Sequence, residues 1–202
     1  MDRPADRYSA VAMLLHWVIA ILLLYNIWLA WQMEDLKGPA RAALMGIHKP
    51  VGITILLLSL VRLGWRLMNP PPPFSAHLKP WERMLAHVTH WSLYVVMIGM
   101  PLAGWAMVSA VKIIRPINMF GLFNWPGLTF LRDMPPDQRR DLHELLEFLH
   151  ADAFKILAYI LIVLHVAGAL KHQFIDRDGE LGRMIPFLRS PRQKDGREAG
   201  PA

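Results

Sequence analysis

The sequence contains no cysteine among its 202 residues. This absence excludes disulfide bonds, thiolate zinc sites, iron–sulfur clusters and covalent haem attachment through a C-x-x-C-H motif. Charged residues are also scarce, at 19% of the chain, whereas soluble domains usually carry about 25%. Since 54% of the residues are hydrophobic, the composition indicates a chain that lies largely in lipid.

Four long apolar runs account for this composition. A helix of roughly 20 apolar residues crosses a hydrocarbon core about 30 Å thick. The runs lie at about 8–31, 47–68, 87–110 and 142–174. We therefore predict an all-α fold, an integral membrane four-helix bundle that forms a single domain over residues 1–186. Residues 187–202 are expected to be a flexible cytoplasmic tail.

The basic residues indicate how the predicted helices are oriented. Thirteen Lys and Arg residues fall on the side that holds both termini and the 69–86 connection, against eight on the other side. Because cytoplasmic loops carry the excess of Lys and Arg, both termini are predicted to be cytoplasmic, in a multi-pass protein of the bacterial inner membrane. This topology also explains the net charge of +6. The expected surroundings are membrane lipid, and no nucleic-acid partner is expected.

Four of the nine histidines lie within the apolar runs: His16, His48, His150 and His165. Ionisable side chains at membrane depth are costly and persist mostly where they are partnered and used. In a chain without cysteine, paired imidazoles suit axial ligation of the iron of non-covalently bound haem. The plainer alternative is that they form hydrogen bonds between helices or lie at the membrane interface.

The predicted orientation sorts these histidines into two pairs. His16 and His165 fall in the cytoplasmic half, and His48 and His150 fall toward the outer side. His150 and His165 are about 22 Å apart along an ideal helix and point about 60° apart, so a kink or π-bulge would align them better. His143 is a rival outer ligand, but at about 33 Å from His165 it ranks second.

Other residues near the predicted helix ends have two interpretations each. Arg62 and Arg66 either extend toward the cytoplasmic surface or pair with haem propionates. His90 and His172 are either interfacial or contact haem propionates or a quinone head-group. The 111–141 connection carries several aromatic side chains, which predicts a loop at the membrane interface.

Short motifs follow one another along most of the chain. They are Arg7-Tyr8 with His16-Trp17, Ile47-His48-Lys49-Pro50-Val51-Gly52, Val61-Arg62-Leu63-Gly64-Trp65-Arg66, the Pro70–Pro73 run, Leu85-Ala86-His87 with His90, Leu164-His165-Val166-Ala167-Gly168-Ala169-Leu170-Lys171-His172, and Phe174-Ile175-Asp176-Arg177-Asp178-Gly179. In this order, over about residues 7–186, the chain resembles the bacterial cytochrome b561 family of four-helix di-haem membrane cytochromes. The resemblance implies two haem b groups and makes His16, His48 and His165 ligands by position.

The fourth ligand departs from the family pattern. The family usually has a His-Glu pair about fourteen residues before the last ligand, but this chain has Ala151 there. His150 lies one residue away from the expected position, and His143-Glu144 keeps the dipeptide at a different distance.

The resemblance also implies a function. Members pass electrons to or from membrane quinone, here expected to be ubiquinone, and some resemble superoxide:quinone oxidoreductases. In that case Lys49, Lys112 and Arg115 would attract the superoxide anion. The alternative is a non-enzymatic cytochrome b subunit that docks to a dehydrogenase or a periplasmic redox partner, so whether the chain is an enzyme stays open.

Overall fold

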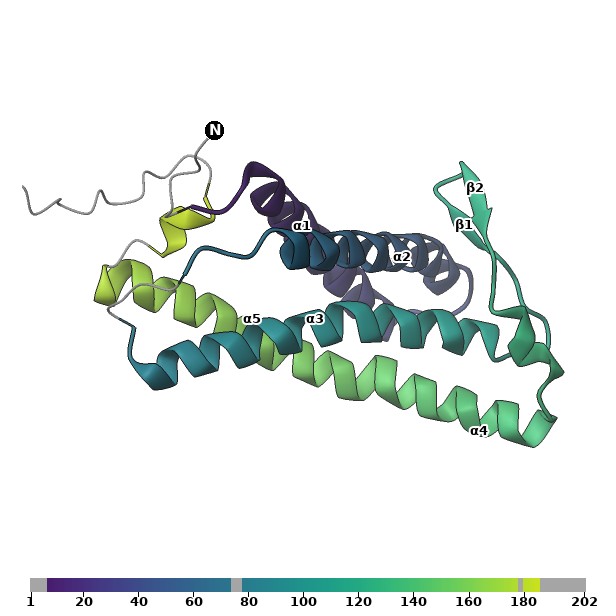
Figure 1. The fold of residues 1–202 in the computed structure, drawn as a ribbon. Helices are drawn as coiled ribbons and strands as arrows, with labels where there is room; N and C mark the ends of the chain where they lie inside the picture. The colour runs from purple at the N-terminus through teal and green to yellow at the C-terminus, as the bar shows by residue number, and fades with distance from the viewer. Residues whose placement is uncertain (1–6, 74–77, 178–179, 186–202) are drawn as a thin grey trace, which may run out of the picture.

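The computed structural model describes residues 7–73, 78–177 and 180–185. They form four long helical segments and a small hairpin (Figure 1). The segments are α1 (Ala10–Glu34), α2 (Gly38–Met68), α3 (Pro80–Ser109), and a continuous run of α4 (Pro136–Glu147), η2 (Phe148–Ala153), α5 (Phe154–Lys171) and η3 (His172–Asp176). All four segments are long and apolar enough to cross a membrane. This confirms the predicted all-α class with four membrane helices, while the predicted tail lies outside the described residues.

The helices begin and end where local chemistry allows. Ser9 caps α1 by accepting a hydrogen bond from the Ala12 amide at 3.3 Å, which satisfies one of the free amides of the first turn. Proline lies in the first turn of both α2 and α3, where a missing amide hydrogen costs nothing. As predicted, α2 stops before the run of prolines that follows Asn69, because each proline removes a backbone donor.

Three segments begin earlier than hydropathy predicts. The helix α2 starts at Gly38 instead of 47, α3 starts at Pro80 instead of 87, and α4 starts at Pro136 instead of 142. Apolar runs mark only the length embedded in lipid, whereas a helix continues for as long as its backbone hydrogen bonds are made. The extra turns carry polar residues such as Arg41 and Arg139, so they extend beyond the apolar core.

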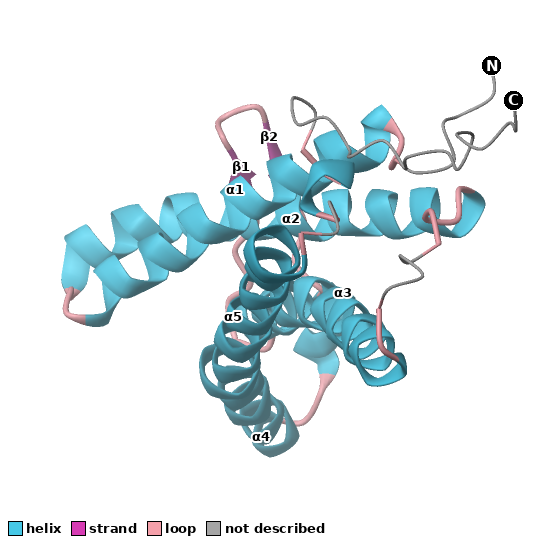
Figure 2. Ribbon diagram, turned by 90° about the vertical axis from the view of Figure 1, so that its left-hand side faces the viewer, coloured by secondary structure: helices cyan, strands magenta, loops and turns pink. Residues whose placement is uncertain are grey.

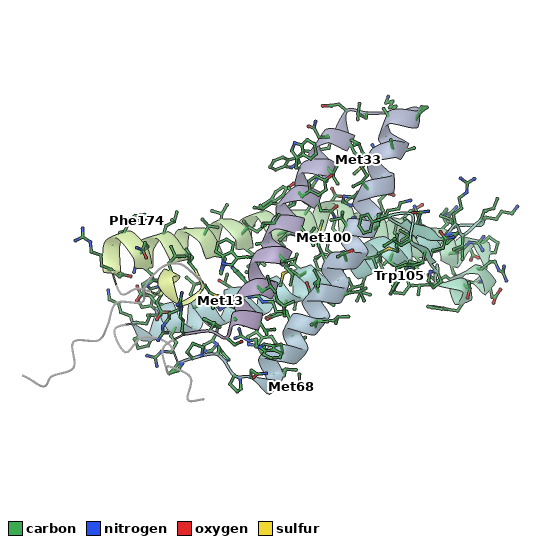
Figure 3. All side chains as sticks on the ribbon, turned by 90° about the horizontal axis from the view of Figure 1, so that it is seen from above. Met13, Met33, Met68, Met100, Trp105 and Phe174 are labelled. Carbon is green, nitrogen blue, oxygen red and sulfur yellow. The ribbon has the colours of Figure 1, made fainter. Side chains whose placement is uncertain are left out.

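The helices pack as two crossed pairs. Contacts join α1 to α2, α2 to α3, and α3 to α4 and α5, and the α1–α2 pair crosses the α3–α5 pair at a steep angle (Figures 2 and 3). Buried residues at the crossings include Ile19 with Tyr94 and Met97, and Val96 with Ala158 and Leu161. Large apolar side chains elsewhere face outward, for example Leu14 and Val163, each 65% exposed. Such surfaces suit lipid rather than water.

Both described ends of the chain lie at the same end of the bundle. Arg7 Nη2 donates to the Ile185 carbonyl at 2.6 Å, and Trp17 Nε1 donates to the Met184 carbonyl at 2.9 Å. Burial raises the pKa of the Tyr8 hydroxyl above its usual 10, with the nearby charge of Arg66 opposing the rise. An even number of membrane helices requires this shared end, here called the inner end; its cytoplasmic location stays a prediction.

The opposite, outer end carries a two-stranded hairpin that the sequence analysis does not predict. Strands β1 (Ile117–Met119) and β2 (Phe123–Trp125) pair antiparallel. Three residues, Phe120 to Leu122, connect the strands. Phe120 and Gly121 have positive φ, 57° and 80°, and the Leu122 amide donates to the Met119 carbonyl at 3.0 Å to close the turn. Ile117 and Met119 pack on Ile53 of α2. Strands of three residues are too short to leave a periodic pattern.

Candidate functional site

Three histidines from three helices meet toward the inner end of the bundle. The ring centroids of His16 on α1 and His165 on α5 are 6.0 Å apart, with the planes at 62°. His90 on α3 lies closer still, 5.3 Å from His165. The structure therefore brings together the predicted pair and adds His90 as a third ring beside it. Sequence spacing alone does not reveal that proximity, because it depends on how α3 packs against α5.

The outer pair joins α2 to the fourth helical segment. The ring centroids of His48 and His150 are 6.1 Å apart, with the planes at 89°. His150 lies in η2, a π-helical turn, which is the kind of distortion expected to align it. Its Nδ1 is 2.7 Å from the Met100 carbonyl oxygen of α3. That bond requires a proton on Nδ1 and leaves Nε2 as the ring's lone-pair nitrogen.

A glycine makes the position of His150 sterically accessible. A Cβ atom added to Gly104 of α3 would lie 2.7 Å from His150 Cε1 and 2.8 Å from Nδ1. Real Cβ atoms essentially never approach another atom so closely, so only glycine lets the ring rest against α3. The structure therefore identifies His150 as the side chain that requires a glycine at position 104.

His143, the rival ligand, lies in α4 against α3. Its Nδ1 is 3.0 Å from the Met107 carbonyl oxygen. It is His150 whose ring faces His48 across the bundle. The two candidates therefore differ in surroundings, although each has a carbonyl partner.

Distance alone does not identify a ligand pair, because packed rings commonly lie about 4.5–7 Å apart. Unpartnered polar atoms are more informative. Within the described residues, the buried Nδ1 atoms of His16 and His48 have no hydrogen-bond partner, and neither do Asn26 Oδ1 and Ser59 Oγ. Leaving such atoms unpaired costs about 1–3 kcal/mol each. The helix faces beside Gly64 and Gly168 are also open, with no atom within 4 Å of an added Cβ.

These observations fit haem better than a bare metal ion. In the described part of the chain, no group of three or more His, Asp or Glu residues could hold a metal on its own. Two imidazoles facing each other suffice for haem, because the macrocycle supplies the remaining iron ligands. Open helix faces beside glycine provide room for a flat ring.

Arginine and aromatic residues line the inner end. Arg62 Cζ lies 5.6 Å from the Tyr94 ring centroid, and Arg66 Cζ lies 5.7 Å from that of Trp91. Cations are attracted to the faces of aromatic rings at such distances. The two guanidinium groups are thus held against α3 and do not simply extend toward solvent. Tyr94, a buried polar side chain in an apolar run, is a contributor that the sequence analysis misses.

His172 takes part in an ion-pair cluster at the inner end. Its Nδ1 lies 3.1 Å from Asp176 Oδ2, which also receives Lys171 Nζ at 2.5 Å. Lys171 Nζ lies 2.8 Å from Glu82 Oε1 as well, and so links α5 to the start of α3. The structure therefore places His172 beside a carboxylate.

An apolar four-helix bundle with a histidine pair toward each end defines the class of membrane cytochromes that hold haem between helices. The family model described as prokaryotic cytochrome b561 matches residues 7–187. The chain belongs to this family. Membership implies haem b as a cofactor, a membrane location and a role in electron transport.

Curated relatives match over nearly their whole length. The chain is 29% identical to cytochrome b561 homolog 2 of Escherichia coli, over 89% of this chain and 92% of the relative. It is 28% identical to the probable superoxide oxidase CybB of Yersinia pestis, over 91% and 98% of the two chains. A further relative is cytochrome b561 homolog 1 of Escherichia coli, 26% identical over 90% and 98%.

Proposed function

We propose that the chain is a di-haem b-type cytochrome that transfers electrons across the bacterial inner membrane, between the outer side and ubiquinone at the cytoplasmic side. The observation that carries this proposal is the presence of two histidine pairs, one toward each end of the apolar bundle. In this proposal the inner end, and with it both termini, is cytoplasmic, as the excess of Lys and Arg indicates.

Four histidines serve as axial ligands in this proposal. His16 and His165 hold the inner haem, and His48 and His150 hold the outer haem. When bound, haem iron accepts and releases single electrons at a potential set by its ligands and its burial. His150 is supported as the fourth ligand because its ring lies against that of His48, with the centroids 6.1 Å apart. Its bond to the Met100 carbonyl also suits a ligand, since metal-binding histidines usually donate their other ring N–H to a carbonyl or carboxylate, but His143 shares that feature.

The inner end supplies groups for carboxylates and for quinone chemistry. Arg62 and Arg66 would neutralise the inner haem's carboxylates, since Arg presents a planar set of donors that fits them. His90 and His172 would contact propionates or the quinone head-group. Quinone reduction takes up protons as well as electrons, and the His172 imidazole lies 3.1 Å from the Asp176 carboxylate at the end from which protons would come.

Superoxide oxidation is the reaction we propose at the outer side. Each superoxide loses one electron and leaves as dioxygen, and two such electrons with two protons convert ubiquinone to ubiquinol. Support comes from the relative named probable superoxide oxidase and from cationic residues at the outer end, including Lys49 and Arg115, which would attract the anion.

A second candidate function is a non-enzymatic subunit that docks to a dehydrogenase or periplasmic protein. The hairpin favours it, because Phe120, Leu122 and Phe123 are 56%, 81% and 54% exposed at the outer end. Exposed apolar patches often mark interaction sites. If the chain is instead a superoxide:ubiquinone enzyme, membrane headgroups would cover the same residues. Measurement of partner binding separates these two candidate functions.

The first experiment is haem quantitation with reduced-minus-oxidised spectra of purified wild type, His150→Ala and His143→Ala. We expect two haems in wild type and in His143→Ala, and one in His150→Ala. His143→Ala is the matched control, because both histidines bond an α3 carbonyl. A single haem in wild type, or a loss confined to His143→Ala, contradicts the scheme. Superoxide-dependent ubiquinone reduction by the isolated protein then tests the enzymatic reading.

A further inference from the structure

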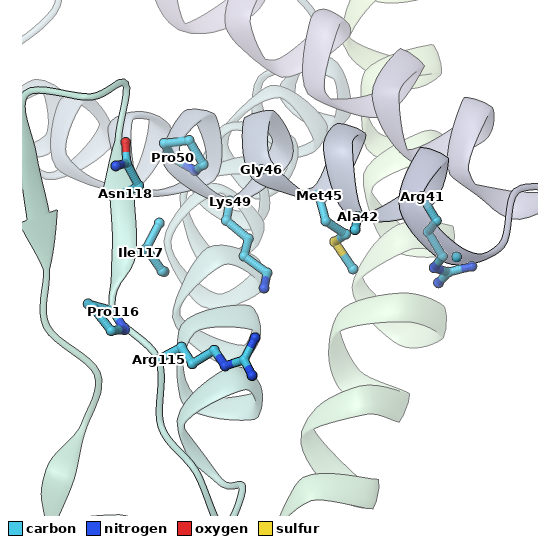
Figure 4. Close-up of a pocket in the computed structure, with 11 residues that line it drawn as sticks. Arg41, Ala42, Met45, Gly46, Lys49, Pro50, Arg115, Pro116, Ile117 and Asn118 are labelled. Carbon is cyan, nitrogen blue, oxygen red and sulfur yellow. The ribbon is translucent and has the colours of Figure 1, made fainter.

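A cavity of about 500 Å³ opens at the outer end, between the first half of α2 and β1 (Figure 4). Its polar side includes three basic residues, and the remaining wall is largely apolar. Its lining includes Arg41, Met45, Lys49, Arg115, Ile117 and Asn118, with no Asp or Glu among the described residues around it.

Among the described residues, none of the three basic side chains has an anionic partner, and only Arg41 has a hydrogen bond. Arg41 Nη1 already donates to the Met33 carbonyl at 3.0 Å. In Figure 4, the charged ends of Lys49 and Arg115 point toward one another across the cavity. No ion pair with a carboxylate is found for either within the part of the chain that the structure describes. Like charges facing each other repel, so an anion between them would stabilise the arrangement.

The anion has to fit this position beside His48. Lys49 follows His48 directly, so the two side chains leave α2 about 100° apart. Lys49 therefore does not point along the same direction as His48. It points sideways from it, toward the position that the edge of a flat group bound by His48 would occupy. A diatomic anion is far smaller than this cavity. A carboxylate on a flexible apolar chain fits it better, because the carboxylate would contact the cations and the chain would contact the apolar wall.

We infer that this cavity receives the propionate carboxylates of the outer haem, with Lys49 and Arg115 as their paired cations. The inference rests on the proposed function, because it requires a haem between His48 and His150. It gives the outer end the counterpart of Arg62 and Arg66 at the inner end. Lys49 and Arg115 thus become positioning residues, in addition to any effect on an approaching anion.

The test combines protein variants with a modified cofactor. Wild type, Lys49→Gln, Arg115→Gln and the double variant are each loaded with haem b or with its dimethyl ester, which lacks the carboxylate charges. Transfer of the outer haem to an excess of apomyoglobin is followed by absorbance. The outer haem is defined as the component missing in His150→Ala. In the samples loaded with haem b, the retained inner haem reports that each variant is folded.

We expect a coupled result. Esterification should speed loss of the outer haem from wild type by about tenfold or more, the scale of a lost charged hydrogen bond. The double variant should lose haem b at that faster rate, and esterification should have no further effect on it. Lys49→Arg should behave as wild type, and so should Lys112→Gln, which removes an outer cation that does not line the cavity.

Two results overturn the inference. Equal effects of esterification in wild type and in the double variant mean that the cations do not contact the carboxylates. Loss of co-purified phospholipid from the double variant, with unchanged haem transfer, assigns the cavity to a lipid phosphate. Absence of an outer haem from wild type is a different failure, which refutes the proposed function itself.

Discussion

Gly104→Ala tests whether the outer site depends on the close approach of His150 to α3. The added Cβ would lie 2.7 Å from His150 Cε1, about 1 Å inside the usual contact distance between carbon atoms. The ring must therefore move away from α3. That movement stretches the 2.7 Å contact between His150 Nδ1 and the Met100 carbonyl oxygen, which holds the ring in place.

The size of the effect follows from these two terms. Overpacking typically costs about 1–3 kcal/mol, and a lost hydrogen bond costs about 1 kcal/mol. Together they amount to about 2–4 kcal/mol, or about 30- to 1,000-fold weaker retention of the outer haem. Retention of the inner haem should not change, because the three atoms nearest the added Cβ all belong to His150.

Haem transfer to apomyoglobin and potentiometric titration measure the effect. Gly52→Ala is the matched control, since its added Cβ would meet only Asn26 Nδ2 at an ordinary 3.7 Å. If Gly104→Ala retains the outer haem at the wild-type rate and potential, His150 is not held as described and its assignment as ligand loses its structural support.

Three further predictions concern other parts of the chain. Ser9→Ala removes both the cap of α1 and the acceptor of the Trp65 Nε1 hydrogen bond at 3.0 Å. Thermal denaturation in detergent should therefore show that the free energy of unfolding falls by about 1–2 kcal/mol. An unchanged midpoint contradicts this expectation. Arg62→Gln should lower only the inner haem's reduction potential, because a nearby cation favours the reduced state, and titration beside an Arg83→Gln control checks this. The double variant Phe120→Ser, Leu122→Ser should leave haem content and quinone reduction by the isolated protein unchanged. Loss of haem would show that the hairpin tip is needed to hold the helices that bind haem.

Much of the fold follows from the sequence because lipid imposes simple rules. A segment that crosses the hydrocarbon must satisfy its backbone internally, so long apolar runs become helices. The helix ends are less predictable, since hydropathy carries no signal once the chain leaves the lipid. That is why the first turns of α2, from Gly38, and of α4, from Pro136, escape the prediction.

The histidine pairs are also predictable, because alternating helix direction converts sequence position into depth. What cannot be read in this way depends on packing between distant segments. The approach of His90 to His165 requires the crossing of α3 and α5. The contact of Gly104 with His150 requires the register between α3 and η2, and the facing of Lys49 and Arg115 requires the hairpin loop to fold over α2.

The π-helical turn at His150 has a consequence for how such a chain changes over time. One residue inserted into a long helix normally rotates everything beyond it by about 100°, which would turn one of two ligands on that helix away from its partner. A π-turn absorbs the extra residue locally. His150 lies one residue further from His165 than the family spacing, and its π-turn lies at that point of the helix. The wider turn thus lets the fourth helix hold one more residue between His150 and His165 while each ring still lies against its partner, His48 or His16.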